Sequence, residues 1–208
     1  MKNMEIRASD IRVDLLQIAR LIGEGSRVLD VGCGDGSLLN YLVRQKNVDG
    51  RGIELSPEGV NQSITKGLSV IQGNAERDII HYPDDCFDYV ILSQTLQAMN
   101  RPDKMLEQLL RVGKKAIVSF PNFGHWRVRL ELFLRGRMPV NKTINNPWYS
   151  TPNIHFCTIR DFVNLCAELN IHIEQSMAIN AEGHRMRFDN MILANLFATQ
   201  GLYVITKA

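Results

Sequence analysis

The chain has 208 residues, of which 45% are hydrophobic and 22% charged, and its formal net charge is +2. This composition is that of an ordinary globular protein, and the length favours a single domain spanning residues 1–208. The small net charge speaks against nucleic acid or an anionic membrane as a partner. Residues 1–7 lack the apolar core of a signal peptide, and no apolar run approaches the roughly 20 residues that span a bilayer. We therefore expect a cytoplasmic protein.

Strands and helices are predicted to alternate through the first two thirds of the chain. A helix capped by Ser9 or Asp10 precedes a short strand at residues 27–31, and three glycines separate this strand from a helix that begins at Ser37. Asp49-Gly50 predicts a turn, and Ser56-Pro57 predicts another helix start. Further strands are expected at residues 51–55, 68–72, 87–92 and 115–120, and further helices at residues 102–112 and 126–134.

The last third of the chain is predicted to be less regular than the first two thirds. Residues 136–153 are rich in proline and asparagine and are expected to be irregular. A helix is predicted at residues 158–169, with Thr158 as its cap and Asp161 in the capping-box position. Two final strands at residues 171–179 and 201–207 are expected to pair in an antiparallel manner. Together the elements predict a doubly wound α/β fold with a mostly parallel, seven-stranded, Rossmann-like sheet.

Polar residues and glycines follow the first four predicted strands. In an open α/β sheet the carboxyl ends of parallel strands meet at one edge, where ligands bind. Glycine permits both the sharp turn and the close approach of a ligand to the backbone. The expected cofactor-binding residues are those at the four strand ends, namely Asp30, Gly32, Cys33, Gly34, Glu54, Leu55, Asn74, Ala75 and Ser93.

The spacing of these residues indicates a ligand with adenine and ribose but no pyrophosphate. The loop reads Gly-x-Gly-x-Gly, whereas a pyrophosphate on a helix N-terminus calls for Gly-x-Gly-x-x-Gly. Glu54 follows Gly34 by twenty residues, a separation typical of a carboxylate that binds a ribose diol, and it would repel a ribose phosphate. We expect S-adenosylmethionine or S-adenosylhomocysteine, with Asp30 holding the ammonium group. An NAD-linked oxidoreductase would need the missing glycine spacing.

Two sets of motifs carry a resemblance to known families. Residues 29–36, Gly52-Ile53-Glu54 and Gly73-Asn74-Ala75 resemble the class I S-adenosylmethionine-dependent methyltransferases. Residues 92–97, 120–127, 136–139 and 148–155 resemble the methionine biosynthesis protein MetW family. The resemblance implies the class I methyltransferase fold and a cytoplasmic role in methionine biosynthesis. It also implies action together with homoserine O-acyltransferase (MetX).

No catalytic residue can be assigned from the residues alone. His125, His155, Gln97, Asn122 and Tyr149 are the polar groups expected over the cofactor. Each histidine is either a general base or an ordinary hydrogen-bonding side chain, and the glutamine cannot act as a base. The Asn-Pro-Pro-Tyr motif of amino-group methylases is missing. Two hypotheses stay open: a cofactor-binding regulator of the acyltransferase, and an active methyltransferase with an unidentified small-molecule acceptor.

The cysteines and histidines give no indication of a metal site. Cys33, Cys86, Cys157 and Cys166 are scattered without a Cys-x-x-Cys pair, so we expect reduced thiols. Cys33 has no histidine near it in sequence, and its small size in a crowded turn explains it better than nucleophilic catalysis. The histidines show no metal-ligand spacing with one another or with the cysteines.

One local excess of basic residues stands out, comprising Arg127, Arg129, Arg135, Arg137 and Lys142. It is interpreted either as a solvated helix face or as a docking surface for an acidic partner or substrate. The neighbouring aromatic pair at residues 148–149 suits a protein interface or a lid that packs onto the cofactor.

Overall fold

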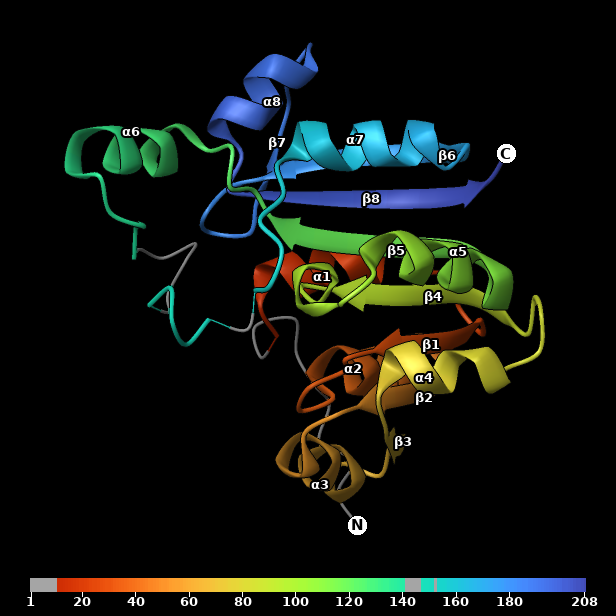
Figure 1. The fold of residues 1–208 in the computed structure, drawn as a ribbon. Helices are drawn as coiled ribbons and strands as arrows, with labels where there is room; N and C mark the ends of the chain where they lie inside the picture. The colour runs from red at the N-terminus through yellow and green to blue at the C-terminus, as the bar shows by residue number, and fades with distance from the viewer. Residues whose placement is uncertain (1–10, 141–146, 152) are drawn as a thin grey trace.

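The computed structural model describes residues 11–140, 147–151 and 153–208 and contains one mixed sheet in the order β3-β2-β1-β4-β5-β8-β6-β7 (Figure 1). The strands are β1 (Arg27–Val31), β2 (Asp49–Glu54), β3 (Ser69–Gln72), β4 (Phe87–Ser93), β5 (Gly113–Pro121), β6 (Ile171–Ile179), β7 (Arg185–Met186) and β8 (Gln200–Lys207). The helices are α1 (Val13–Leu21), α2 (Ser37–Lys46), α3 (Pro57–Thr65), α4 (Ala75–Asp78), α5 (Pro102–Val112), α6 (Trp126–Arg135), α7 (Ile159–Glu168) and α8 (Met191–Phe197). In the described ranges there are also two 3₁₀ turns, η2 (Ile79–His81) and η3 (Leu96–Ala98).

The first five strands of the sheet are parallel, so their carboxyl ends share one edge. Val31 at the end of β1 lies opposite Ile53 of β2 and Leu92 of β4. The strand order reverses between β1 and β4, the position at which an open α/β sheet leaves a crevice for a ligand. β8 is antiparallel to β5 and to β6. The predicted doubly wound, mostly parallel fold is confirmed.

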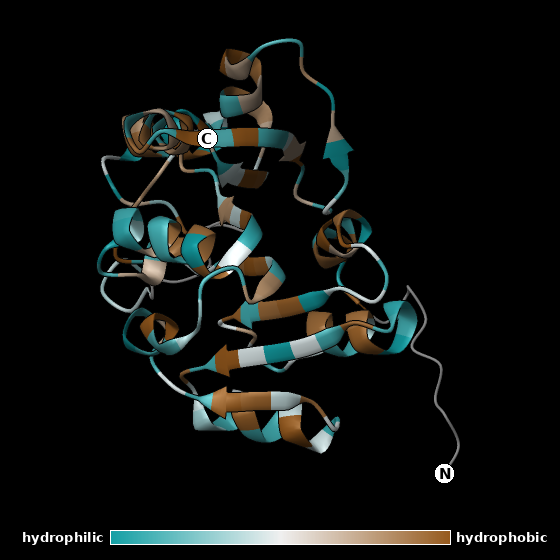
Figure 2. Cartoon of the chain, turned by 90° about the vertical axis from the view of Figure 1, so that its right-hand side faces the viewer, coloured by the Kyte–Doolittle hydropathy of each residue, from teal (hydrophilic) through white to brown (hydrophobic). Residues whose placement is uncertain are grey.

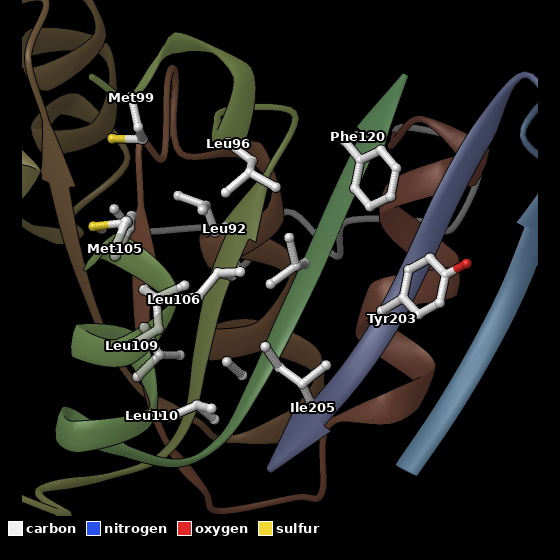
Figure 3. Packing of buried hydrophobic residues seen from close by; sticks show 14 of the residues in the cluster. Leu92, Leu96, Met99, Met105, Leu106, Leu109, Leu110, Phe120, Tyr203 and Ile205 are labelled. Atoms are coloured by element: carbon white, nitrogen blue, oxygen red, sulfur yellow. The ribbon is translucent and has the colours of Figure 1, made fainter. Parts of the chain in front are cut away.

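Helices cover both faces of the sheet because successive strand residues point to opposite sides. One core contains Ile18 of α1 and Leu42 of α2 together with Ile91 of β4. The other contains Leu106 of α5 and Phe162 of α7, together with strand residues such as Leu92, Val118 and Ile205. Figure 3 shows the α5 side chains directed at β4, and Figure 2 shows hydrophobic positions on both the strands and the helices.

The antiparallel half of the sheet is joined to the parallel half by aromatic packing. The ring of Phe120 on β5 lies 4.7 Å from that of Phe162 and 5.8 Å from that of Tyr203 on β8. All three side chains are buried. Aromatic pairs at these distances add stability beyond the burial of their surface.

The structure corrects three local predictions. Asp49-Gly50 lies within β2 and not in a turn; the turn occurs at Asn47, whose φ is +51°. Gly50 is needed there for packing, because a Cβ would lie 2.6 Å from Leu39 Cδ1. Helices α4 and α8 were not predicted. The short edge strand β7 is an eighth strand in a sheet predicted to have seven.

The predicted cap of the first helix, Ser9 or Asp10, lies outside the described residues, and α1 follows Arg12 without a side-chain cap. By contrast, the capping box of Thr158 and Asp161 at α7 is confirmed. Within the described ranges, no helix is long and apolar enough to cross a bilayer.

Candidate functional site

Two cavities that share Gly32 lie at the carboxyl ends of β1, β2, β3 and β4. The larger, of about 280 Å³, is the adenosine-side cavity; its lining comprises Gly32, Ile53, Glu54, Leu55, Gly73, Asn74, Ala75, Glu76, Thr95, Ala98, Met99 and Asn100. The smaller, of about 160 Å³, is the glycine-loop cavity; its lining comprises Arg12, Leu15, Asp30, Gly32, Cys33, Gly34, Asp35, Ser37, Leu38, Ser93 and Gln94. All nine residues predicted to bind a cofactor therefore line one of these two cavities.

The glycine loop after β1 has a backbone that only glycine adopts easily. Gly32 and Gly34 have φ values of +72° and +56°. A Cβ on Gly32 would lie 2.9 Å from Thr95 Oγ1, so this position is also sterically closed. A Cβ on Gly34 would meet no atom within 4 Å and would instead project into open space. The open space beside the Gly34 backbone is available to a ligand.

Glu54 connects the end of β2 to the glycine loop. Its Oε2 accepts a hydrogen bond of 2.8 Å from Gly34 N, and its Oε1 accepts one of 2.8 Å from Ser56 N. A carboxylate can accept about four hydrogen bonds in total, so capacity for a ribose diol remains. The sequence predicted that Glu54 contacts ribose, but it did not predict the hydrogen bond between Glu54 and Gly34 N.

Asp30 has a buried carboxyl group beside the glycine loop. Its side chain is only 2% exposed, and within the described part of the chain it takes part in no hydrogen bond or ion pair. Burial, and secondarily the charge of Glu54, raises its pKa to about 7. A buried carboxyl at the wall of a cavity is stabilised in its charged form by a cationic ligand. Its chemistry therefore fits an ammonium group in the glycine-loop cavity.

Asn74 and Glu76 shape the floor of the adenosine-side cavity. Asn74 caps α4 by accepting a 3.0 Å hydrogen bond from Glu76 N through its Oδ1. Its amide nitrogen makes no hydrogen bond among the described residues and is available as a donor. Glu76 accepts hydrogen bonds from Asn100 Nδ2 at 2.7 Å and from Arg101 N at 3.0 Å. These bonds hold the segment after η3 against the cavity.

Gln94, directly after β4, has a strained backbone at the glycine-loop cavity. Its φ is +56°, which is uncommon for a residue other than glycine. Two bonds hold it: its N donates to Ser119 O at 2.9 Å, and its Nε2 donates to Gln200 Oε1 at 3.2 Å. Strain of this kind concentrates at functional sites. The predicted end of the fourth strand indicated this position. The sequence assigned no binding role to Arg12, Thr95 or Met99, although Thr95 lies in the motif at residues 92–97.

Two of the predicted polar candidates have structural roles. Asn122 is fully buried; its Nδ2 donates to Asn195 O and Ala198 O at 2.8 Å each, and its Oδ1 accepts from two backbone amides. His125 Nδ1 accepts a 3.2 Å hydrogen bond from Arg127 N and caps α6. Burial lowers the pKa of His125, so it is neutral at pH 7.

The remaining three candidates also lie outside the two cavities. Tyr149 is 74% exposed, and His155 Nε2 lies 3.3 Å from Asn100 O. Gln97 is buried, and neither of its amide atoms has a partner in the part of the chain described. Gln97 and His155 line a third, mostly apolar cavity of about 280 Å³ between α5 and α7. None of the five predicted candidates therefore lines the adenosine-side cavity or the glycine-loop cavity.

Cys33 is unsuited to nucleophilic attack. Burial, followed by the charges of Asp30 and Glu54, raises the pKa of its thiol to about 12, so the thiolate is not formed at neutral pH. Its sulfur would lie 2.7 Å from a Cβ on Gly52, which shows how closely the loop packs on β2. No cluster of three or more potential metal ligands occurs among the residues that the structure describes.

The sheet order and the cavities at its parallel edge define a Rossmann-like S-adenosylmethionine-dependent methyltransferase fold. The crystal structure of a TehB-like S-adenosylmethionine-dependent methyltransferase from Corynebacterium glutamicum matches with a TM-score of 0.62. The match covers 96% of this chain and 89% of that one at 16% sequence identity, a likeness in fold alone.

Within this class, the model of the family "Methionine biosynthesis protein MetW" matches residues 12–205, and the chain belongs to that family. The bifunctional methionine biosynthesis protein MetXA/MetW of Rhodopirellula baltica is 35% identical over 190 residues, which is 86% of this chain and 30% of that protein. Ajmaline N-methyltransferase of Rauvolfia serpentina is 25% identical over 154 residues, covering 70% of this chain and 52% of the enzyme. The chain thus spans only part of the length of both relatives.

Proposed function

We propose that the chain is an S-adenosylmethionine-binding protein of methionine biosynthesis that acts with, or regulates, a homoserine O-acyltransferase of the MetX type. The observation that carries the cofactor assignment is the buried carboxyl of Asp30 at the glycine loop, which has no hydrogen-bond or ion-pair partner among the described residues. A cationic amino-acid group would supply the partner that Asp30 lacks. The adjoining adenosine-side cavity offers a matching place for the nucleoside.

Each cavity residue has a role in this proposal. Asp30 holds the ammonium group, directly or through water, and the open backbone at Gly34 accepts the amino-acid end. Glu54 binds the ribose hydroxyls with the hydrogen-bond acceptor positions that remain after its bonds to Gly34 N and Ser56 N. The Asn74 amide nitrogen donates to the adenine edge. When bound, S-adenosylmethionine supplies an activated methyl group to this site.

A regulatory role is favoured over methyl transfer by the placement of the polar candidates. Proton removal from an acceptor needs a base within hydrogen-bond reach, and none of the five predicted candidates lines either cavity. S-adenosylmethionine is made from methionine, so its binding can report the output of the pathway. The fused relative, in which MetXA and MetW parts share one chain, supports the acyltransferase as the partner. We also propose a cytoplasmic location, because the family takes part in methionine biosynthesis.

The alternative is an active methyltransferase with a small-molecule acceptor. It is supported by the similarity to ajmaline N-methyltransferase over 70% of this chain. This alternative predicts slow formation of S-adenosylhomocysteine once the right acceptor is present.

Calorimetric titration with S-adenosylmethionine, S-adenosylhomocysteine and NAD tests the cofactor assignment. We expect the first two to bind and NAD to fail. The acyltransferase of the same organism, purified with and without this chain, tests the role. We expect the two proteins to co-purify and acyltransferase turnover to depend on the complex. Loss of both the interaction and the rate effect in a purified mixture would refute the regulatory role.

A further inference from the structure

Helix α6 is exposed on nearly all sides. It follows β5 and extends away from the sheet (Figure 1), and Val128 is its only buried residue. The side chains of Phe133 and Leu134 are 85% and 69% exposed. The other large apolar side chains exposed on this helix are Trp126, Leu130 and Leu132. We call these five residues, together with Arg127, Arg129, Arg135 and Arg137, the α6 surface.

A helix with this composition is not stable on its own in water. It has ten residues, and isolated helices shorter than about 12–15 residues are marginal even with favourable sequences. Six of its ten residues are apolar, and the apolar face of a helix is normally buried against another element. The exposed apolar residues are also contiguous along one short element, which marks an interaction site. The α6 surface therefore needs a covering partner.

The charges on the α6 surface indicate the chemistry of that partner. Arg127, Arg135 and Arg137 are exposed, and the Arg127 guanidinium lies 5.3 Å from the centre of the Trp126 ring. Arginine and tryptophan are the residues most enriched in binding hot spots. A guanidinium group pairs best with a carboxylate. The covering partner should present an apolar groove with an acidic rim.

A two-fold contact between the α6 surfaces of two copies of this chain does not meet that requirement. Two-fold contacts bring the same patch together from both copies. The four arginines at positions 127, 129, 135 and 137 would then face one another, with Glu131 as the only acid of α6. Like charges across an interface are unfavourable. A partner of different sequence is favoured.

We propose that the α6 surface binds the homoserine O-acyltransferase. Phe133 and Leu134 enter an apolar groove of that partner, and the arginines pair with carboxylates at the rim of the groove. This inference rests on the proposed function, which supplies the partner. α6 begins five residues after the end of β5, at the same edge of the sheet as the two cavities. Docking there would bring the acyltransferase close to the adenosine-side and glycine-loop cavities.

The test uses the full chain and the purified acyltransferase of the same organism, with affinity measured by calorimetry. The double variant Phe133→Glu/Leu134→Glu is expected to lose at least about a hundredfold in affinity, since it would place two unpaired carboxylates in an apolar groove. The matched control is Ile64→Glu on α3, where the side chain is 54% exposed, and it should bind as tightly as the unaltered chain.

A second variant, Arg135→Glu/Arg137→Glu, leaves the apolar anchors in place and keeps the proposal testable if the first variant misfolds. It should slow association and weaken the salt dependence of binding. Circular dichroism and S-adenosylmethionine titration check the fold of each variant, because none of these positions lines the cofactor cavities.

The outcomes separate the two proposals. If the unaltered chain does not bind the acyltransferase, the partner and the docking surface are both wrong. If the unaltered chain binds and both folded α6 variants bind within about twofold of it, the partner stands and the docking surface is wrong. If gel filtration shows that α6 instead joins two copies of this chain, and acyltransferase binding survives the variants, the surface is a homodimer contact.

Discussion

At the scale of single residues, the protonation of Asp30 should make the proposed binding of S-adenosylmethionine depend on pH. With a pKa of about 7, the carboxyl is mostly charged at pH 8 and mostly neutral at pH 6. If only the charged form binds the ammonium group, the affinity for S-adenosylmethionine falls about tenfold between these two values. Calorimetry across this range measures the slope. Asp30→Asn should bind weakly and without this slope; an unchanged affinity in this variant would contradict the assignment.

The same carboxyl makes the ligand-free protein less stable as the pH rises. The folded state keeps the Asp30 proton up to about pH 7, whereas an unfolded chain loses it near 3.8. The folded state therefore binds more protons between these values, and the Asp30 contribution to the free energy of unfolding falls as the pH rises through them. Denaturation at pH 5 and pH 8 should show a smaller difference for Asp30→Asn than for the unaltered chain.

The two glycines Gly34 and Gly25 separate backbone strain from blockage of the cavity. Both have a positive φ, and a Cβ on either would meet no atom within 4 Å. Only Gly34 lines the glycine-loop cavity. Gly34→Ala and Gly25→Ala should each lower the free energy of unfolding by about 1 kcal/mol. Only Gly34→Ala should weaken S-adenosylmethionine binding. Equal loss of binding in both variants would assign the effect to strain alone.

Gln97 is a buried amide that the protein would be more stable without. Its Nε2 and Oε1 have no partners among the described residues, and an unpaired buried polar group costs about 1–3 kcal/mol. Gln97→Met keeps the volume and the backbone, so its free energy of unfolding should rise by about 1 kcal/mol. Chemical denaturation measures the change. A lower stability would mean that the amide is bonded through water.

The residues of the candidate site were predictable to the extent that they follow strands. Asp30, Glu54 and Asn74 occur at predicted strand ends, and parallel strands bring such positions to one edge. The catalytic candidates His125 and Asn122 could not be judged in the same way. The partners of Asn122, such as the carbonyls of Asn195 and Ala198, are distant in sequence and become neighbours only in the fold. His125 bonds the nearby Arg127 N, but its burial depends on the fold.

At the scale of elements, Asn122 joins the end of β5 to α7 and α8. Its side chain bonds the carbonyls of Asn195 and Ala198 and the amides of Gly124 and Ile159. Asn122→Ala leaves four buried backbone groups unpaired and should lower the free energy of unfolding by about 3 kcal/mol or more.

The matched control for Asn122 is Asn190, which caps α8 at an exposed position by accepting a 2.9 Å hydrogen bond from Leu193 N. Asn190→Ala removes a single exposed cap and should cost about 1 kcal/mol. Thermal and urea denaturation compare the two. Equal losses would show that Asn122 acts only as a local turn residue.

Elements were predicted best where they carry a strong local signal. The bounds of β1 and α5 agree with the prediction, since a β-branched run and a proline at the helix start mark them clearly. The four-residue helix α4 and the two-residue strand β7 are too short to show a hydrophobic period. The turn predicted at Asp49-Gly50 was wrong because these two residues pair with Arg27 and Val28 in the sheet. That pairing overrides the turn preference of their composition.

At the scale of the whole molecule, β8 carries the connection between the two halves of the sheet. Val204 pairs with Ile117 of β5 on one side and with Gln175 of β6 on the other, whereas Arg185 on the edge strand β7 pairs only with Ile179. Val204→Pro removes an amide donor from an inner strand, so the single cooperative unfolding transition should be lost. Arg185→Pro should change the melting temperature little. Calorimetric melting distinguishes them, and a mild effect of Val204→Pro would show that the halves fold independently.

The inner position of β8 also affects the order in which the chain can assemble during synthesis. The strands β1 to β5 are complete in sequence by residue 121, but β5 has an open edge until residues 200–207 arrive to pair with it. During that interval a nascent chain presents an unpaired, apolar strand edge on the ribosome, the kind of surface that chaperones cover and that aggregates at high concentration. Translation of the segment between β5 and β8 is therefore the period in which this protein is most vulnerable.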